Sequence, residues 1–368
     1  MSSILTSRTG RRNGERGIVL VIVIIIIAVL MILVTDLIYF TQIDTEISTN
    51  TRDEIKARYI AKSGVHVAAG TLKDRPLEEL STLTSALGGG QSGNPDGFWS
   101  ISVPYFPVGE GSVSVTVTDE RSKINLNALV SGSSNNVDQQ VLTELTELFR
   151  LLGVDDSKSE RFIASLINWT DLPIEGAEND QDSAGANGSF YASLDPPYRI
   201  KDGPLDTVQE IRMIDGMDDE FYNKIKDYVT VYPKDKKVNF STAPKAVLIA
   251  AIKGASVSSV PGQGGDSSEQ IDDDVAEQLA NEIIEARKDD PIMTQKRIRE
   301  LARDVDAAEI NSGLVGVALG NGESEIFTVR AVGSLGEANP TKRIIEAVIK
   351  KSRRDQQDVV DFVTWKEL

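Results

Sequence analysis

The chain has 368 residues and is acidic, because 39 lysines and arginines stand against 56 aspartates and glutamates for a formal net charge of −17. A surface of this sign opposes the binding of nucleic acid, whose phosphates need a basic face. There is no cysteine, and His66 is the one histidine. These counts exclude disulfides and thiol chemistry, and they argue against serine–histidine catalysis and histidine-rich zinc sites.

The N-terminus combines a basic stub with a long apolar run. Four arginines precede Gly17, and residues 18–34 carry no charge. As a helix this run would span roughly 26 Å, close to the thickness of a bilayer core. No signal-peptidase motif follows it, so the expected cut lies between Gly17 and Ile18 and leaves the apolar helix on the mature protein. The arginines predict a cytoplasmic N-terminus with everything beyond Asp36 outside. From charge and length alone, an ordinary single-pass anchor remains the alternative.

Periodicity then predicts one long helix followed by a hairpin. Residues 18–75 are apolar all round at first and one-faced later, which is typical of a helix that leaves a membrane and packs on a domain. A turn-rich loop ends at Gly97. Alternating apolar and polar residues at 98–108 and 112–120 predict two strands, so residues 76–124 form the first part of a small α+β domain.

A helical block interrupts that domain. Helical patterns occur at 142–152, 159–169, 209–231, 243–253 and 272–288. Strand patterns return at 326–334 and 344–350. We therefore predict a helical domain, residues 125–322, inserted into an α+β domain that residues 323–352 complete. The tail, residues 353–368, contains the apolar stretch VVDFVTW and is interpreted as a terminal helix or a partner-binding peptide.

The inserted block contains a faint repeat. The segment from Lys123 to Asn127 (KINLN) matches the segment from Lys237 to Ser241 (KVNFS). Each places two apolar residues on one side of a short strand and is followed by a helical stretch. We expect Asn125 and Asn239 to hold turns rather than to act in catalysis.

The chain resembles the type II secretion system minor pseudopilin K family from about residue 16 to residue 352. The resemblance rests on the leader RRNGERG, on ARYIAKSGVHVA and DERSKINLNAL, and on LINWTD, GAEND, YASLDPPYR and KVNFSTAPKAVL. It implies an α+β, type IV pilin-like fold, in which a long N-terminal helix and a small antiparallel sheet carry a large inserted, mostly α-helical domain.

The resemblance also implies a life cycle for the chain. Prepilin peptidase would remove the leader, residues 1–17, between Gly17 and Ile18 and methylate Ile18. From the inner membrane, with its bulk in the periplasm, the protein would pass to the tip of a short pseudopilus beside minor pseudopilins I and J and above H. There it would promote export of secreted cargo as a structural protein and not as an enzyme. Its helix would contact lipid and then its partners through Val19, Leu20, Ile22, Leu30 and Leu33.

The residue at position 22 indicates where in the filament this chain would lie. It stands at the fifth mature position, where pilin-like proteins usually carry a glutamate, and its lack is typical of the K family. A buried carboxylate needs a partner, in a pilus the terminal amine of a neighbouring subunit. A subunit without the carboxylate makes no such pair with a subunit above it and suits the tip.

The best candidate binding site is an acidic, loop-like segment between Asp171 and Asp206. Oxygen ligands on a flexible loop are what Ca²⁺ requires, and the resemblance implies a calcium site here. Glu178 and Asp180 lie in the GAEND match, and Asp171, Asp182 and Asp195 are further candidates. The stretch QDSAGANGS follows Asp180 where the family runs quickly into an aromatic pair, and this departure can displace a ligand. A plain solvated acidic loop is the alternative.

Two other functions stay open at this point. One is a minor pilin of a type IV pilus, from the same superfamily. The other is a membrane-anchored hydrolase that uses paired carboxylates, such as Glu178 with Asp195, as general acid and base. Catalysis of that kind needs one carboxyl with a raised pKa in a cleft.

Overall fold

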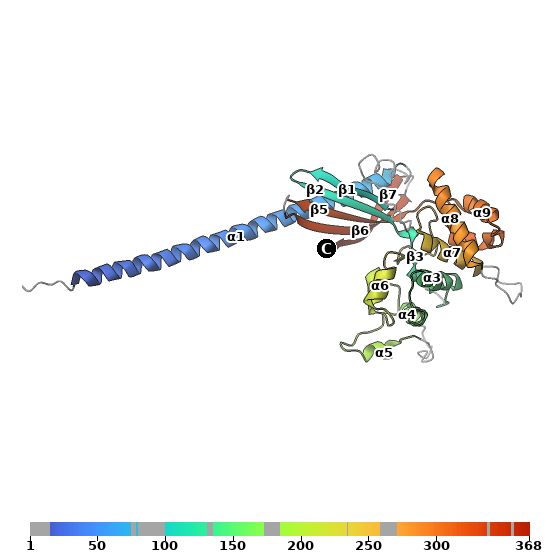
Figure 1. Ribbon diagram of the computed structural model, residues 1–368, viewed down its shortest axis with the longest axis horizontal. Helices are drawn as coiled ribbons and strands as arrows, with labels where there is room; N and C mark the ends of the chain where they lie inside the picture. Colours follow the sequence, from blue (N-terminus) through green and yellow to red (C-terminus); the bar gives the residue numbers. More distant parts are fainter. Residues whose placement is uncertain are drawn as a thin grey trace, which may run out of the picture.

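A computed structural model describes residues 15–74, 79, 100–130, 135–172, 185–233, 235–257, 271–336, 339–354 and 357–368. One helix, α1 (Glu15–Asp74), projects far out of the molecule, and its C-terminal part lies on an antiparallel sheet (Figure 1). The helical domain lies at the other end of that sheet. The fold is α+β, with the long helix, antiparallel sheet and inserted helical domain that the sequence predicts.

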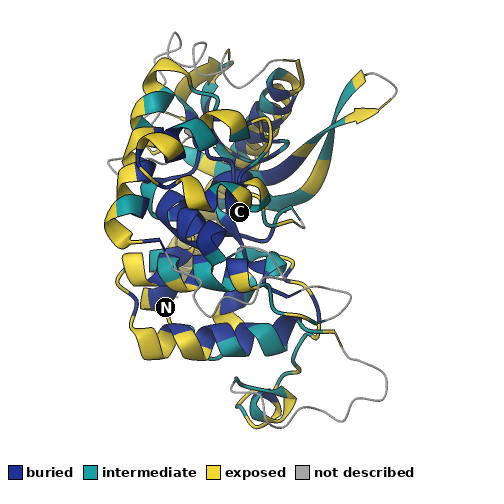
Figure 2. Ribbon diagram, turned by 90° about the vertical axis from the view of Figure 1, so that its right-hand side faces the viewer, coloured by how far each residue is buried: buried dark blue, intermediate teal, exposed yellow. Residues whose placement is uncertain are grey.

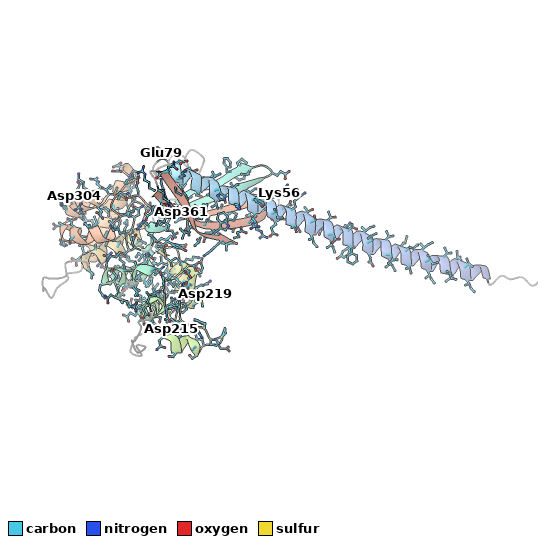
Figure 3. The ribbon with its side chains drawn as sticks, turned by 180° about the vertical axis from the view of Figure 1, so that it is seen from behind. Lys56, Glu79, Asp215, Asp219, Asp304 and Asp361 are labelled. Atoms are coloured by element: carbon cyan, nitrogen blue, oxygen red, sulfur yellow. The ribbon has the colours of Figure 1, made fainter. Side chains whose placement is uncertain are left out.

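The two halves of α1 have different surroundings. Its N-terminal half is apolar and exposed, and side chains project around its whole circumference (Figure 3). Its C-terminal half buries a stripe of mostly small residues at helical spacing: Ala57, Ala61, Val65, Ala69 and Leu72. Small side chains permit a close approach to the sheet, where a Cβ on Gly333 would collide with the backbone of Ala57 and Ala61. The predicted change from an all-round apolar helix to a one-faced helix is confirmed.

Five strands form the sheet in the order β1-β2-β5-β6-β7, with every pair antiparallel. Their bounds are Ser100–Val108 (β1), Gly111–Asp119 (β2), Ile326–Leu335 (β5), Thr341–Arg354 (β6) and Gln357–Glu367 (β7). The predicted hairpin is β1–β2, and the returning strands are β5 and β6. The inserted domain leaves the sheet after β2 and returns at β5, so its two crossings lie on neighbouring strands.

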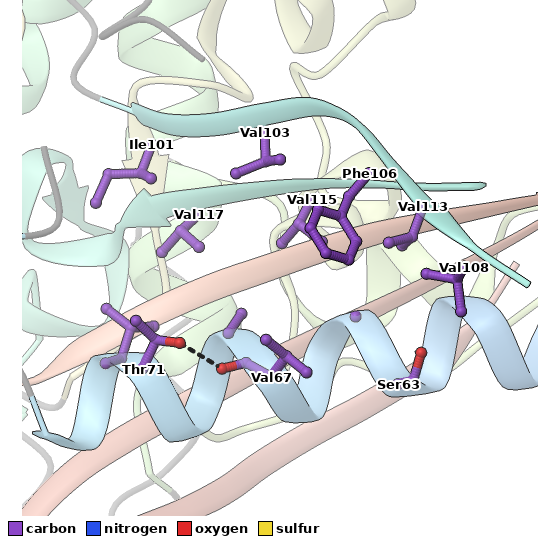
Figure 4. A pocket seen from close by; sticks show the side chains of 13 residues that line it. Ser63, Val67, Thr71, Ile101, Val103, Phe106, Val108, Val113, Val115 and Val117 are labelled. Atoms are coloured by element: carbon purple, nitrogen blue, oxygen red, sulfur yellow. Dashed lines mark hydrogen bonds between the residues drawn. The ribbon is translucent and has the colours of Figure 1, made fainter. Parts of the chain in front are cut away.

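An apolar groove of about 260 Å³ lies between α1 and the β1–β2 hairpin (Figure 4). Val103, Phe106 and Val108 of β1 face Ser63 and Val67 of α1 across it. The sheet therefore contacts the helix closely at β5 and stands farther from it at β1.

The prediction for the C-terminal tail is wrong in its secondary structure. Residues 357–367 form β7, the edge strand beside β6, and not a terminal helix. Val360 and Trp365 pack against the core beneath α1. Val360 and Trp365 are five positions apart and reach the same face because Val363 is the extra residue of a bulge, so the strand shows no regular alternation in the sequence.

The inserted domain is mainly helical and has its own core, seen as the buried faces in Figure 2. Its helices are α3 (Gln139–Leu151), α4 (Asp156–Thr170), α5 (Gly188–Ala192), α6 (Asp219–Ile225), α7 (Lys245–Val257), α8 (Asp273–Asp289), α9 (Gln295–Asp304) and α10 (Asn311–Val317). Short 3₁₀ turns are η1 (Glu120–Ser122), η2 (Leu126–Ala128), η3 (Val208–Met213) and η4 (Ala308–Ile310), and the short strands are β3 (Ile124–Asn125) and β4 (Val229–Thr230). Figure 1 places α8 and α9 on one side of this domain and α4 to α6 on another.

The stretch 209–231 is helical for much of its length, as predicted, but in two pieces. Gly216, whose φ is 88°, separates η3 from α6, and β4 follows α6. Helices α9 and α10 were not predicted. Each is short, and α9 is dominated by charged residues, so its apolar face of Ile298, Leu301 and Ala302 is easily missed.

The two segments of the predicted repeat make the same hydrogen bond. The Asn125 side-chain oxygen accepts from the Asn127 amide at 3.0 Å, and the Asn239 oxygen accepts from the Ser241 amide at 3.0 Å. Asn125 follows Ile124 in β3, which pairs with β4 in parallel, and Val238 makes an isolated parallel bridge to Ala318. Both asparagines hold turns, as expected, and the two units hold the base of the inserted domain.

Candidate functional site

The predicted assembly residues lie on the exposed N-terminal half of α1. Val19 is 61% exposed, Ile22 49% and Leu33 58%, and Leu20 and Leu30 are similarly open. The helix is long and apolar enough to cross a membrane. Such exposure of large apolar side chains is unfavourable in water, so this half of α1 needs lipid or other helices around it.

Several threonine hydroxyls along α1 donate to carbonyls of the same helix. Thr35 donates to the Met31 carbonyl at 2.8 Å, Thr45 to Thr41 at 2.7 Å and Thr51 to Ile47 at 2.8 Å. Back-bonding of this kind hides a polar group that would otherwise be costly against lipid or an apolar partner. Thr35, Thr45 and Thr51 are therefore compatible with a surface covered by apolar neighbours.

The predicted processing site lies at the start of α1. Gly17 and Ile18 are both helical, Ile18 is 62% exposed, and no heavy atom lies within 4 Å of the place a Gly17 Cβ would occupy. Residues 1–14 of the leader lie outside the described residues. The space beside the Gly17 Cα is therefore open among the described residues.

Two of the five candidate calcium ligands lie within the described residues, and three lie outside them. Glu178, Asp180 and Asp182 lie outside the described residues. Asp171 caps the C-terminus of α4, and Asp195 is exposed beyond α5. Within the described ranges, no three carboxylates or histidines converge as a metal site would require.

Both ends of the segment that contains GAEND are fixed to α4 or its neighbours. The Leu172 amide donates to the Asn135 side-chain oxygen at 3.0 Å, and Asn135 donates back to the Leu172 carbonyl at 2.6 Å. On the far side, the Ala186 amide donates to Ser165 Oγ at 3.1 Å, and Asn168 donates to the Ala186 carbonyl at 3.3 Å. The intervening residues therefore begin and end at α4.

An aromatic cluster lies beside this segment. Trp169 and Tyr191 are 2% and 0% exposed, with ring centroids 5.2 Å apart, and Tyr198 lies 5.3 Å from Tyr191. Trp169 donates its indole N–H to Glu210 at 2.9 Å. Trp169 and Tyr191 belong to the core of the inserted domain, and Tyr198 packs against that core.

The most densely bonded polar group in the described chain joins the two domains. Arg121, in η1, donates to Asp235 of the inserted domain at 2.7 and 2.8 Å and to Glu325 at the start of β5 at 2.5 and 2.8 Å. Its side chain is 5% exposed. The two carboxylates raise the pKa of the guanidinium further above its ordinary value against the opposing effect of burial. One cation thus holds a carboxylate from each domain.

The two residues before Arg121 complete this group, which we call the junction (Asp119, Glu120 and Arg121). Asp119 accepts from Asn239 at 2.9 Å and Thr242 at 2.6 Å, and burial raises its pKa. Glu120 accepts from Thr328 of β5 at 2.7 Å and from Thr230 of β4. Burial would raise the pKa of Glu120, but the ammonium of Lys123 at 2.8 Å and the hydroxyls of Thr230 and Thr328 together outweigh burial and lower the pKa.

Sequence reasoning did not single out the junction. The signal was present, because three consecutive ionisable residues follow a strand of apolar alternation with no glycine or proline to mark a solvated loop. Buried charged residues are uncommon unless paired. The pairing partners lie more than 100 residues away, so the sequence order hid them.

Comparisons with known proteins agree with this architecture. The family model for type II secretion system (T2SS) protein K matches residues 122–234, the first part of the inserted domain. Type II secretion system protein K of Pectobacterium carotovorum is 27% identical over 196 residues, which cover 51% of this chain and 56% of that protein. The protein of the same name from Klebsiella pneumoniae is 26% identical over 246 residues, covering 65% and 70%.

This chain is similar to proteins of the type II secretion system protein K family. The alignments span about half to two thirds of the length of these relatives.

A solved structure extends the likeness in fold to nearly the whole chain. It is a chain of the GspK-GspI-GspJ complex from enterotoxigenic Escherichia coli, with a TM-score of 0.54 and 20% sequence identity. The match covers 89% of this chain and 98% of that one. The residues matched by the family model contain Asn125, and Asp235, whose carbonyl accepts from the Asn125 side chain, lies just beyond them.

Proposed function

We propose that this chain is a minor pseudopilin at the tip of the type II secretion pseudopilus, where it promotes export of folded proteins across the outer membrane. The observation that carries the proposal is that the two ends of the molecule are different. The apolar, exposed half of α1 extends from one end of the sheet, and the inserted domain occupies the other end (Figure 1). A subunit of this shape packs its helix among the helices of a filament. Its inserted domain then lies beyond the end of that filament.

The proposed partners are minor pseudopilins I and J, with H below them. The relative of similar fold is part of a complex with GspI and GspJ, which supports the first two. Before assembly, the helix would span the inner membrane with its N-terminus in the cytoplasm and the two folded domains in the periplasm. Prepilin peptidase and membrane lipid would be its partners at that stage, and secreted cargo a later one.

Ile22 supports a terminal position. It is apolar and 49% exposed on α1, so it offers no carboxylate to the terminal amine of a subunit above. An unpaired carboxylate at this depth would be costly. We infer that the chain begins the filament and acts as a structural component without enzymatic activity.

The first test is the mature N-terminus. We expect mass spectrometry of the protein made with prepilin peptidase to show an N-methylated Ile18, and protein made without the peptidase to keep its leader. A matched control is Gly17→Leu, which places a large side chain before the bond and should block the cut. Retention of Met1 with the peptidase present, or a cut beyond Val34, would overturn the proposal.

The names of the relatives favour a secretion machine over a type IV pilus. A pilus minor pilin would be required for filaments on the cell surface. Deletion of the gene should therefore abolish export of secreted enzymes and leave surface pili unchanged, which an assay of culture supernatants and electron microscopy would measure.

We further propose that the segment from Asp171 to Asp195 binds Ca²⁺, with Glu178 and Asp180 as its principal ligands. Its support is the chemistry of the donor set, together with the fixing of both ends at α4. The ion would supply only charge neutralisation and local order.

Calcium should then stabilise the folded state. At a free concentration about 100 times the dissociation constant, linkage predicts a gain of about 2.7 kcal/mol, seen as a higher Tm than in excess chelator. The variant Asp180→Asn should lose most of this shift, whereas Asp215→Asn, whose carboxylate pairs with Arg161, should keep it. An equal calcium shift in both variants would contradict the assignment.

A further inference from the structure

The two edges of the sheet are built differently. β1, at one edge, contains Pro104 and Pro107 and a bulge between Val103 and Phe106. Proline and bulges are common devices that keep an edge from pairing with another strand. β7, at the other edge, runs for 11 residues without proline or glycine. β7 has a bulge of its own at Val363, but it lacks the prolines that interrupt β1.

The charged residues of β7 do not replace that protection, because each is engaged within the molecule. Asp361 pairs with Arg354 of β6 at 2.8 Å, and Asp358 lies 3.9 Å from Arg353 of the same strand. Glu367 pairs with Arg58 of α1 at 2.8 Å. The remaining charged residue, Lys366, donates to Gln209 of the inserted domain at 3.3 Å.

The backbone of β7 offers hydrogen-bonding groups to a further strand. Ile344 and Leu368 exchange both of their backbone hydrogen bonds, at 2.9 and 3.4 Å. In an antiparallel pair such residues alternate with residues whose N–H and C=O point the other way. Glu367 and Trp365 therefore direct these groups away from β6, toward the open side of the sheet.

A cluster of rings lies beside this edge. His66 of α1, Phe362 and Trp365 have ring centroids 5.4 to 5.8 Å apart. Phe362 is 42% exposed. Val363 is the extra residue of a bulge, with no partner on β6, and is 44% exposed. Exposed aromatic surface beside a free strand edge combines main-chain pairing with a side-chain anchor, the two elements of recognition by strand addition.

We propose that β7 is a docking strand, on whose outer edge a β-strand of a neighbouring minor pseudopilin pairs while placing an apolar side chain on the His66–Phe362–Trp365 cluster. This inference rests on the proposed function. It commits to a neighbouring pseudopilin because β7 is joined to α1 through Glu367 and Trp365. The edge is therefore continuous with the helix surface on which a neighbouring subunit would pack.

Site-specific photo-cross-linking in the full-length chain tests the proposal. A benzophenone amino acid would replace Val363 at the open edge, Tyr105 at the proline-containing edge, or Leu30 in α1. Tyr105 is a matched control because it is 65% exposed on the opposite edge strand. With pseudopilins I and J produced in the same cells, we expect position 363 to cross-link to a strand of I or J, several-fold more than position 105.

A pair of variants isolates the backbone contribution. Glu367→Ala removes the contact with Arg58 but keeps the outward N–H, whereas Glu367→Pro removes both. Because that N–H points away from β6, proline costs no hydrogen bond within the sheet, which an unchanged circular dichroism spectrum would verify. We expect the cross-link from position 363 to persist in the alanine variant and to disappear in the proline variant.

The outcomes are distinct. Cross-links from Leu30 to I or J without any from position 363 would overturn the docking strand and leave the proposed function intact. No cross-link from either position would overturn both. A cross-link from position 363 to a second copy of this chain, or an equal yield in the two Glu367 variants, would also overturn the proposal.

Discussion

Replacement of Arg121 by alanine is expected to lower the free energy of unfolding by about 3 kcal/mol, because removal of one member of a buried ion-pair group leaves its partners uncompensated. Arg121 is the shared donor to Asp235 and Glu325, so its loss leaves two carboxylates facing one another. Their partial exposure, 49% and 33%, lets water screen them and keeps the cost toward the low end of the range for buried pairs. Urea denaturation near pH 7 measures the change.

A surface ion pair of the same form is the matched control. Arg161 donates two hydrogen bonds to Asp215, at 2.6 and 2.8 Å, but its side chain is 60% exposed. Arg161→Ala should therefore cost less than about 1 kcal/mol. Equal effects of the two alanine variants would show that the junction is no more than another surface contact.

The junction also predicts how the two domains respond. Trp169 reports on the inserted domain, and Trp365 on the sheet. With Arg121 present, the bonds from one side chain to both domains favour a single unfolding transition. In Arg121→Ala the fluorescence of the inserted domain should change at lower urea than that of the sheet, measured in variants that keep either Trp169 or Trp365 as the single one of the chain's three tryptophans.

The success of prediction from the sequence depends on how far apart in the sequence the interacting residues lie. The halves of α1, the β1–β2 hairpin and the turns at Asn125 and Asn239 depend on residues within a few positions of each other, and the predictions for them are confirmed. Periodicity and capping are local properties, so one sequence is enough to read them.

The misses have the opposite character. The edge strand β7 is defined by its pairing with β6. Its apolar side chains Val360 and Trp365 pack against a core that forms only when α1 lies on the sheet. The junction depends on partners more than 100 residues away, and burial of its acids cannot be inferred from residue type. The calcium ligands were proposed from family likeness and composition, and three of them lie beyond the described residues, so they stay predictions.

Glu144 leads to the second large effect, which depends on pH. It lies in α3, buried against α7, where its polar partner is the Gln140 amide, which donates to it at 2.9 Å. Its Cγ and Oε1 are so close to Gly254 that no side chain could replace that glycine without movement. Burial raises the pKa of this carboxyl to about 8, from an ordinary 4.5, although the Gln140 hydrogen bond opposes the shift.

We expect Glu144→Gln to remove a pH dependence of stability that the natural chain has. A folded-state pKa above the unfolded one means that the folded protein binds the extra proton, so the contribution of Glu144 is fully present below pH 4.5 and is lost as the pH rises through about 8. By linkage the loss is about 5 kcal/mol across this window. Glutamine has the shape of the protonated acid and keeps an acceptor for Gln140, so the variant should be the more stable protein at pH 8 and about equal at pH 5.

Denaturation midpoints at several pH values test this prediction. The control is Glu147→Gln, one turn along the same helix and paired with Arg150, which should keep the pH slope of the natural chain. Parallel curves for the natural chain and Glu144→Gln from pH 5 to pH 9 would mean that water or a cation reaches Glu144 and keeps it ionised.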